Sequence, residues 1–267
     1  MKYILALVTL VMLAGCFSAG KNMKANTGTA INPVVAHRGA FKKNGFPENS
    51  IASLREAIRL GCAGSEFDVR MTADDSLVIN HDPDYHKLPI EKTNYADLQQ
   101  YQLSNGEKLP TLQEYILAGL ENNPGTLLVC EIKPSAISKE RGKQVAEMVV
   151  NLFRQLHAGG KVVYISFDYD ILLKIKELHP AAITQYLDGN KTPAQLKADG
   201  ISGLDYHFSV FKNHPEWITE ARSLGLALNA WTVNDATTMD WLLEQRFDYI
   251  TTNEPELLGE KIKAKTK

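Results

Sequence analysis

The amino-acid sequence predicts a (β/α)8 barrel, the TIM-barrel fold, with a short insertion after the second strand. From residue 33 onward, short apolar runs typical of strands alternate with segments of helical periodicity. These runs amount to about eight strands, and several are continuously apolar, as expected for a parallel sheet covered by helices. The sequence has no glycine-rich nucleotide loop of the kind found in open doubly wound sheets. These observations together favour a closed barrel.

The individual elements follow from the apolar runs and from the residues that bound them. Strands are expected at residues 33–40, 64–71, 76–80, 126–132, 161–167, 182–186, 203–206, 226–232 and 249–252. Helices are expected at 49–60, with Asn49 or Ser50 near the N-cap, and at 111–120, 139–156, 170–178, 193–198, 215–223 and 236–244. The stretch 84–109 is polar and irregular, and it is interpreted as the insertion, either a loop excursion or a small element.

The composition is ordinary for a globular protein. Of the 267 residues, 44% are hydrophobic and 22% are charged, and the formal net charge is −2. Single α/β barrels commonly have this length. The charge gives no electrostatic reason to expect nucleic acid as a partner, and the lysine-rich C-terminal tail is expected to be a solvated terminus.

The N-terminus predicts a targeting segment. A lysine at the second position precedes an apolar run, residues 3–13, that is too short to span a bilayer comfortably. The run ends in Leu-Ala-Gly before Cys16, which resembles the lipobox of bacterial lipoproteins, where the cysteine is lipidated. The alternative is a plain secretory signal that contains a cysteine by chance.

We therefore expect a lipoprotein signal peptide at residues 1–15, a flexible tether at 16–32 and the barrel domain at 33–267. Lipidation of Cys16 would anchor the chain to a membrane. This predicts a lipid-anchored protein of the cell envelope, on the periplasmic or the outer-membrane side. The sequence does not indicate an oligomeric state.

Three carboxylates fall in a pattern typical of a metal site. Glu66 and Asp68 are two residues apart in a predicted strand, so their side chains point to the same face and repel each other unless positive charge neutralises them. Glu131 and Lys133 share a face of a later strand by the same rule. In one barrel the C-terminal ends of these strands meet at one rim, and an oxygen-rich site there suits Mg²⁺ or Ca²⁺ better than zinc. Each carboxylate taken alone could equally be a surface or ion-paired residue.

Two histidines also follow predicted strands. His37 ends the apolar run at residues 34–36, and His81 ends the run at residues 77–80, at what we interpret as an equivalent position. Two imidazoles beside a phosphate ester could serve as general acid and general base. Arg38 offers a planar fork that matches phosphate oxygens, and Gly39 would permit an unusual turn or a close backbone approach. The alternative for either histidine is a structural or exposed side chain.

Other rim residues carry weaker signals. Trp231 follows a later strand and could form a wall of a substrate pocket, although an aromatic residue there is often part of the core. His207 is a weaker rim candidate. Glu254, after the last strand, is interpreted as a cap or as a residue that supports the site from behind.

The ordered set of motifs resembles the glycerophosphodiester phosphodiesterase family, in a bacterial lipoprotein form. No single motif is decisive, but the set spans nearly the whole mature domain. The residues that carry the resemblance are His37-Arg38-Gly39, Pro47-Glu48-Asn49-Ser50, Glu66-Phe67-Asp68-Val69, Thr72, His81-Asp82, Leu112, Glu131-Ile132-Lys133 and Trp231-Thr232-Val233-Asn234. The fold that the resemblance implies is again a (β/α)8 barrel.

The resemblance also implies roles for individual residues. Glu66, Asp68 and Glu131 would bind one divalent metal ion, Ca²⁺ or Mg²⁺, and Arg38 and Lys133 would hold the substrate phosphate. His37 and His81 would be the acid/base pair. One departure concerns the segment after Asp82, where family members often carry an arginine and paired threonines, and where this chain has Pro-Asp-Tyr-His-Lys-Leu. The identity of the alcohol group that is recognised therefore stays open.

The implied reaction is metal-dependent hydrolysis of a small-molecule glycerophosphodiester to sn-glycerol 3-phosphate and an alcohol. The nucleophile could be water or the glycerol 2-hydroxyl. A first alternative is a phospholipase C- or D-like enzyme of the same barrel type that acts on intact lipid. A second is a non-catalytic lipoprotein that binds phosphorylated ligands, which would be expected to lack an acid, a base or a metal ligand.

Overall fold

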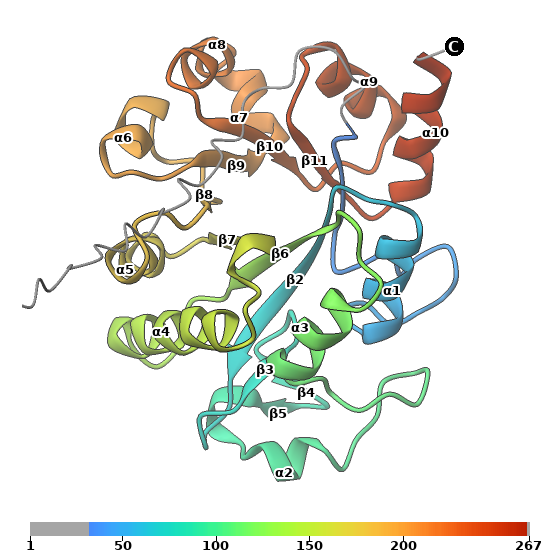
Figure 1. Ribbon diagram of the computed structural model, residues 1–267, viewed down its shortest axis with the longest axis vertical. Helices are drawn as coiled ribbons and strands as arrows, with labels where there is room; N and C mark the ends of the chain where they lie inside the picture. The colour runs from blue at the N-terminus through green and yellow to red at the C-terminus, as the bar shows by residue number, and fades with distance from the viewer. Residues whose placement is uncertain (1–31, 266–267) are drawn as a thin grey trace, which may run out of the picture. The chain divides into compact units, whose positions relative to one another are not determined.

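A closed barrel of eight parallel strands forms the centre of the domain in the computed structural model, which describes residues 32–265 (Figure 1). Its sheet order is β1-β11-β10-β9-β8-β7-β6-β2, and pairing between β1 and β2 closes it, which confirms the predicted fold. The strands of the barrel are β1 (Val34–Ala36), β2 (Gly64–Met71), β6 (Leu127–Ile132), β7 (Val162–Ser166), β8 (Thr184–Tyr186), β9 (Gly203–His207), β10 (Ala227–Trp231) and β11 (Tyr249–Thr252).

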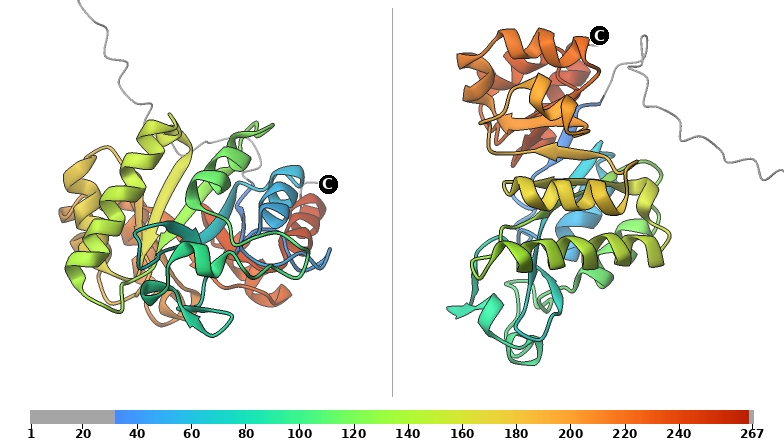
Figure 2. Two further views of the ribbon diagram at one scale, coloured as in Figure 1. Left: turned by 90° about the horizontal axis from the view of Figure 1, so that it is seen from below. Right: turned by 90° about the vertical axis from the view of Figure 1, so that its left-hand side faces the viewer.

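Helices cover the outside of the barrel, and α4 and α5 run side by side (Figures 1 and 2). The helices confirmed from the sequence are α1 (Ile51–Arg59), α3 (Leu112–Leu120), α4 (Lys139–Gln155), α5 (Tyr169–Leu178), α6 (Pro193–Ala198), α8 (Glu216–Ser223) and α9 (Ala236–Glu244). The sequence did not predict α7 (Phe208–Asn213) or α10 (Pro255–Lys265). The lysine-rich tail was expected to be solvated, but Lys261 of α10 lies 2.7 Å from Asp240 of α9.

Local signals explain where several helices begin. The Ser50 hydroxyl accepts a hydrogen bond from the backbone N–H of Ser53, so Ser50 is the N-cap of α1. Thr111 and Glu114 form a reciprocal capping box at the start of α3. These caps satisfy backbone donors that the first turn of a helix leaves unpaired.

The core has two parts. The larger apolar cluster lies between the strands and the surrounding helices. A smaller one fills the barrel interior with Val35, Val129, Val163, Ile165 and Leu187. Because side chains alternate along each strand, one set packs outward against helices and the other fills the barrel. The polar residues of the predicted site continue the inward-facing set toward the C-terminal rim.

The predicted strand at residues 76–80 is not a barrel strand. It forms β3 (Leu77–Ile79), which pairs antiparallel with β2. Only residues 72–76 separate the two strands, and the backbone N–H of Thr72 bonds to the carbonyl of Ser76. A parallel crossover needs a dozen or more residues, so this short connection can only form a hairpin.

The insertion after the second barrel strand is present and has its own structure. It contains β4 (Asp84–Tyr85), β5 (Leu88–Pro89), the 3-10 turn η1 (Ile90–Lys92) and α2 (Tyr95–Leu98). A separate apolar cluster supports it, formed by Val78, Tyr85, Ile90, Leu98 and Leu109. The insertion is therefore a small packed element and not a loop excursion.

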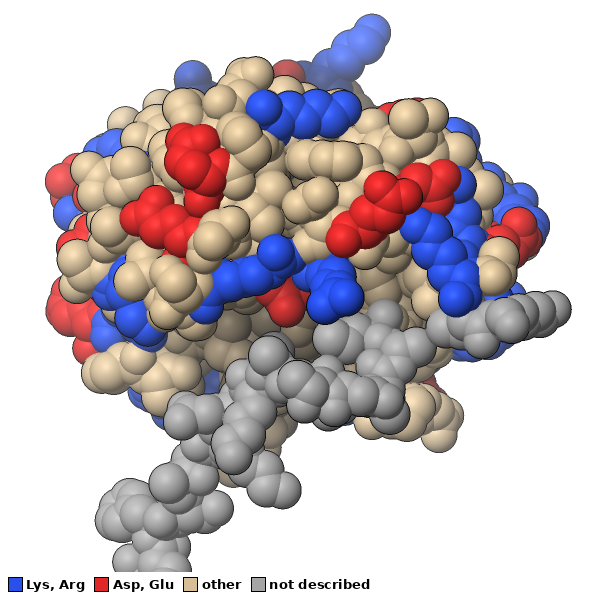
Figure 3. Space-filling view, turned by 90° about the horizontal axis from the view of Figure 1, so that it is seen from above, with Lys and Arg blue, Asp and Glu red and all other residues tan. Residues whose placement is uncertain are grey.

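The predicted signal peptide, tether and lipidation site at Cys16 lie outside the described residues, and the predicted membrane anchor remains a prediction. Within residues 32–265, none of the helices combines the length and apolar character needed to cross a membrane. On the face shown in Figure 3, acidic and basic side chains are interspersed and do not form one large region of a single sign. That distribution, like the net charge of −2, gives no argument for a polyanionic partner.

Candidate active site

The three predicted carboxylates meet at the rim of the barrel. Glu66 and Asp68 project from β2 and Glu131 from the neighbouring β6, where Asp68 and Glu131 are direct strand partners. One oxygen from each of the three lies within 4.8 Å of the others, and all three side chains are buried. Glu66 Oε1 has no hydrogen-bond partner. A buried carboxylate oxygen without a partner is costly, so the donor set fits a hard divalent cation.

The electrostatics of the cluster agree with this fit. Burial, together with the charges of Asp68 and Glu131, raises the pKa of Glu66 well above its ordinary value. Burial and the Asp68 charge also raise the pKa of Glu131 to about 7. Burial opposes the ionisation of Asp68, but Lys133 and His81 hold its pKa below the ordinary value. Three carboxylates this close resist full ionisation unless a positive charge joins them.

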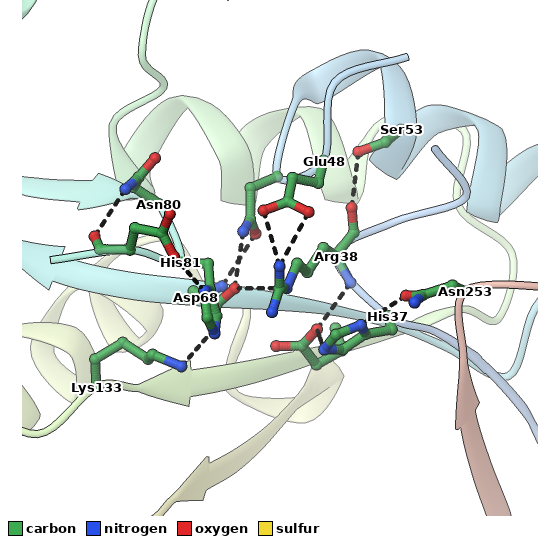
Figure 4. Close-up of polar contacts among 12 residues, drawn as sticks. His37, Arg38, Glu48, Ser53, Asp68, Asn80, His81, Lys133 and Asn253 are labelled. Carbon is green, nitrogen blue, oxygen red and sulfur yellow. Dashed lines mark hydrogen bonds and ion pairs between the residues drawn. The ribbon is translucent and has the colours of Figure 1, made fainter. Parts of the chain in front are cut away.

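Two basic side chains flank the carboxylates (Figure 4). Lys133 Nζ lies 2.7 Å from Glu131 Oε1 and 3.1 Å from Asp68 Oδ1. Arg38 Nε lies 3.7 Å from Asp68 Oδ2, while Arg38 Nη1 donates to both oxygens of Glu48 at 2.9 and 3.0 Å. Both cations, predicted as phosphate ligands, therefore lie beside the predicted metal ligands. Each of these side chains contributes one positive charge. Together they do not neutralise three ionised carboxylates, so a bound cation would complete the charge balance.

An unusual turn places Arg38. Its backbone has a φ of 54°, and that of Gly39 is 79°. The Arg38 N–H donates to Glu66 Oε2 at 2.8 Å. A Cβ on Gly39 would come within 2.4 Å of Ser53 Oγ, so only glycine fits between this turn and α1. The close approach and the turn predicted for Gly39 are thus confirmed, and strain of this kind is often found at functional sites.

Asn49 supports Asp68 from behind. Its φ is 58°, and the side chain is buried. Nδ2 of Asn49 donates to Asp68 Oδ2 at 2.8 Å, and Oδ1 accepts from the Asp68 backbone N–H at 3.1 Å. Both ends of the amide are therefore used to orient one carboxylate. The sequence suggested only a helix cap for this residue.

His37 follows β1 and is largely enclosed. Its Nδ1 lies 2.7 Å from Asn253 Oδ1, and its Nε2 lies 3.9 Å from Glu66 Oε2. Because an amide oxygen only accepts, Nδ1 carries the hydrogen and Nε2 keeps a lone pair. Burial is the main cause that lowers the pKa of His37 to about 4, assisted by Arg38. At neutral pH the imidazole is therefore neutral and able to accept a proton.

His81 reaches the same site by a route that the sequence did not predict. Ser65 of β2 pairs with β1 on one edge and β6 on the other, and Val69 pairs with β3 and β6 in the same way. A strand has two edges, so β1 and β3 share one edge of β2. His37 leaves β1 toward the rim, and His81 returns along β3 toward it. Figure 4 shows His81 beside Asp68.

The aromatic residue predicted for the pocket lies at the same rim. Trp231 is the last residue of β10, and its Nε1 donates to the Asp205 carbonyl at 2.8 Å. Its ring packs edge-on against Phe167, at 5.4 Å between centroids, and against His207, at 5.3 Å. These contacts form an aromatic group that can line a pocket. Glu254 directly precedes α10 (Pro255–Lys265), and its carbonyl accepts the Leu258 N–H, which agrees with the predicted cap. Its carboxylate forms an ion pair with Lys42.

The structure adds supporting residues that the sequence analysis did not assign to the site. Asn253 orients His37, Asn49 orients Asp68, and Glu48 holds Arg38. Asn253 is itself held, because its backbone N–H donates to Asn234 Oδ1 at 2.9 Å. The sequence offered one signal for these residues, which is that each is polar and lies directly after a predicted strand or within a motif. Such a position does not show which side chain each of them contacts.

Comparisons with known proteins agree with this geometry. Residues 37–257 match the model of the glycerophosphoryl diester phosphodiesterase family. A glycerophosphodiester phosphodiesterase of Caldanaerobacter subterraneus is 28% identical over 242 residues, which cover 84% of this chain and 95% of that protein. The match thus covers most of this chain and nearly the whole of that protein.

Solved structures give the same result. The crystal structure of a glycerophosphodiester phosphodiesterase from Parabacteroides distasonis is 37% identical, with a TM-score of 0.85 over 89% of this chain and 99% of that one. An Oleispira antarctica phosphodiesterase, solved with its product sn-glycerol 3-phosphate, is 26% identical, with a TM-score of 0.76 over 87% of this chain and 97% of that one. The chain belongs to the glycerophosphoryl diester phosphodiesterase family.

Proposed function

We propose that this enzyme hydrolyses glycerophosphodiesters to sn-glycerol 3-phosphate and an alcohol, with one Ca²⁺ or Mg²⁺ ion and two histidines. Its class, phosphoric diester hydrolase, follows from its family. The observation that carries the proposal is the convergence of two imidazoles, two basic side chains and three carboxylates at one rim. The relative solved with sn-glycerol 3-phosphate supports the same product.

Each group at the rim has a role that its position allows. Glu66, Asp68 and Glu131 would hold the cation, which when bound supplies a Lewis acid for a phosphoryl oxygen. Arg38 and Lys133 would bind the remaining phosphate oxygens and stabilise negative charge that develops in the transition state. Trp231 would line the pocket for the organic part of the substrate. The buried setting strengthens each of these electrostatic interactions.

The two histidines divide the proton transfers. His37, neutral and with a free lone pair on Nε2, would take the proton from the nucleophile, either water or the glycerol 2-hydroxyl. His81, whose Nδ1 lies 2.8 Å from Asp82 Oδ1, keeps Nε2 available and would protonate the leaving alkoxide. An alkoxide is a poor leaving group, so this protonation contributes directly to the rate.

Asn253 gives a specific test of the base. Replacing it with alanine (Asn253→Ala) removes the acceptor that fixes the tautomer of His37, and we expect kcat to fall on the order of 10- to 100-fold. Asn253→Asp keeps an acceptor at the same place and is expected to retain most of the activity. Steady-state kinetics of both variants measure the effect. An alanine variant with wild-type kcat would show that His37 does not depend on this contact.

The overall reaction is tested by product release. Purified enzyme is incubated with glycerophosphocholine, glycerophosphoethanolamine and glycerophosphoinositol, and sn-glycerol 3-phosphate is measured in a coupled assay. Phosphatidylcholine and sphingomyelin serve as the matched intact lipids. We expect glycerol 3-phosphate from at least one diester and no cleavage of the lipids. Cleavage of the lipids alone would instead establish a phospholipase.

A further inference from the structure

Arg70 makes a contact with the loop of His81 that the proposed reaction has not yet used. It lies on β2 two residues beyond Asp68, and so on the strand face that carries Glu66 and Asp68. Its Nε and Nη2 both donate to the backbone carbonyl oxygen of His81, at 3.0 and 2.6 Å. The guanidinium is therefore hydrogen-bonded to the backbone of His81, one of the two proposed catalytic histidines.

The contact is not an ordinary salt bridge. Arg70 is partly buried, and burial is the main cause that lowers its pKa. Within residues 32–265, no carboxylate lies at ion-pair distance from it, and its two hydrogen bonds go to a neutral carbonyl. Asp68, Glu91, Glu131 and Asp82 attract this charge from a greater distance, but they offset only part of the effect of burial. The position of His81 therefore explains an arginine here better than the stability of the fold does.

His81 has few other fixed contacts. It follows β3, which is only three residues long, at the point where the chain enters the insertion. Its ring nitrogen meets Asp82, but the Asp82 side chain is 75% exposed, and exposed ion pairs hold geometry weakly. The backbone N–H of Asn80 bonds to the Asp68 carbonyl and anchors the residue before it. The two charge-assisted bonds from Arg70 act on the backbone of His81 itself, and they come from the strand that carries the carboxylate cluster.

We propose that Arg70 is a positioning residue that fixes His81 for proton transfer to the leaving group. This inference rests on the proposed catalytic role of His81. Arg70 connects the strand of the carboxylate cluster directly to the backbone of the acid, so the two halves of the site keep one relative position. A displacement of about 1 Å at a catalytic group can cost on the order of 100-fold in rate.

The test is a double-mutant cycle with Arg70→Ala, His81→Asn and the double variant. On glycerophosphocholine, R70A is expected to lower kcat about 10- to 100-fold with little change in KM. If Arg70 acts through His81, adding R70A to H81N should change kcat by less than about threefold. The same factor in both backgrounds, or an effect confined to KM, would overturn the inference.

A second substrate separates positioning from folding. The p-nitrophenyl ester of glycerol 3-phosphate has a leaving group that needs no proton, so both H81N and R70A should lose much less activity on it. Arg141→Ala is the matched control, because Arg141 Nη2 also donates to a backbone carbonyl of this hairpin, that of Thr72 at 2.6 Å. R141A should affect both substrates equally. An R70A variant that behaves like R141A would contradict the proposal.

Arg70→Lys tests whether a shorter cation can partly replace the guanidinium. Arg70→Lys keeps a donor and a charge, and it should recover part of the kcat that R70A loses, which keeps the test valid if R70A folds poorly. Near-full activity of H81N would instead reject the proposed function of His81. That outcome is read from the single variant, so it is distinct from the result of the cycle.

Discussion

Replacing His37 or His81 with alanine is expected to lower kcat at least about 1,000-fold while the protein still binds its cation. Neither imidazole belongs to the cluster of Glu66, Asp68 and Glu131, so the predicted metal ligands stay in place. The loss should fall on kcat because proton transfer occurs only as the reaction proceeds. Steady-state kinetics and calorimetric titration with Ca²⁺ and Mg²⁺ measure the two properties separately.

The control for this experiment is a histidine outside the site. His214, which follows α7 and contacts Glu216, is such a residue, and His214→Ala should keep the wild-type kcat. A variant of His37 or His81 with near-full activity would remove that residue from the mechanism. Loss of cation binding in either variant would move the histidine into the metal site instead.

Removal of the cation is expected to abolish activity, and Ca²⁺ or Mg²⁺ should restore it after treatment with EDTA. Glu66→Gln tests the same site by changing one of the predicted ligands of the cation. It removes a buried charge whose Oε1 has no partner, while an amide oxygen can still accept the N–H of Arg38. We therefore expect a cation affinity about 10- to 100-fold weaker and a comparable loss of kcat/KM.

Glu66→Gln should weaken cation binding but increase the stability of the protein in the absence of a cation. In EDTA at neutral pH the variant should unfold at a higher temperature than the wild type, because the burial and the neighbouring carboxylates that raise the pKa of Glu66 no longer oppose folding. At the same concentration, added cation should raise the melting temperature of the wild type more than that of the variant. Asp82→Asn, which removes an exposed carboxylate outside the cluster, should respond to cation like the wild type. A wild-type protein whose melting temperature ignores both cations would contradict the predicted site.

Much of this arrangement could be predicted from local pattern. The alternation of strands and helices indicates the barrel, and a spacing of two residues on one strand places Glu66 and Asp68 together. The barrel in turn brings the end of β6, with Glu131 and Lys133, to the same rim. These inferences depend only on the period of a strand and on the chirality of the fold, and the sequence carries both.

Contacts between distant segments needed the tertiary structure. His37 and Asn253 are 216 residues apart and meet only because the last strand closes the barrel against the first. The left-handed backbone at Asn49 turns a predicted helix cap into a support for Asp68. Single-residue φ angles and partners across a closed sheet are set by the whole fold, and no local pattern specifies them.

His81 shows most clearly where the division lies. The sequence by itself determined that an imidazole follows an apolar strand near the site. It also determined that Glu66 and Asp68 share one strand and that Glu131 lies at the end of a later one. Only the tertiary structure decided that this strand runs antiparallel to β2, on the same edge of β2 as β1. It also decided that Arg70 donates to the His81 carbonyl. The physical reason is that side-chain alternation is a local property of the chain. Strand direction, edge sharing and hydrogen-bond partners arise from how the strands pack together.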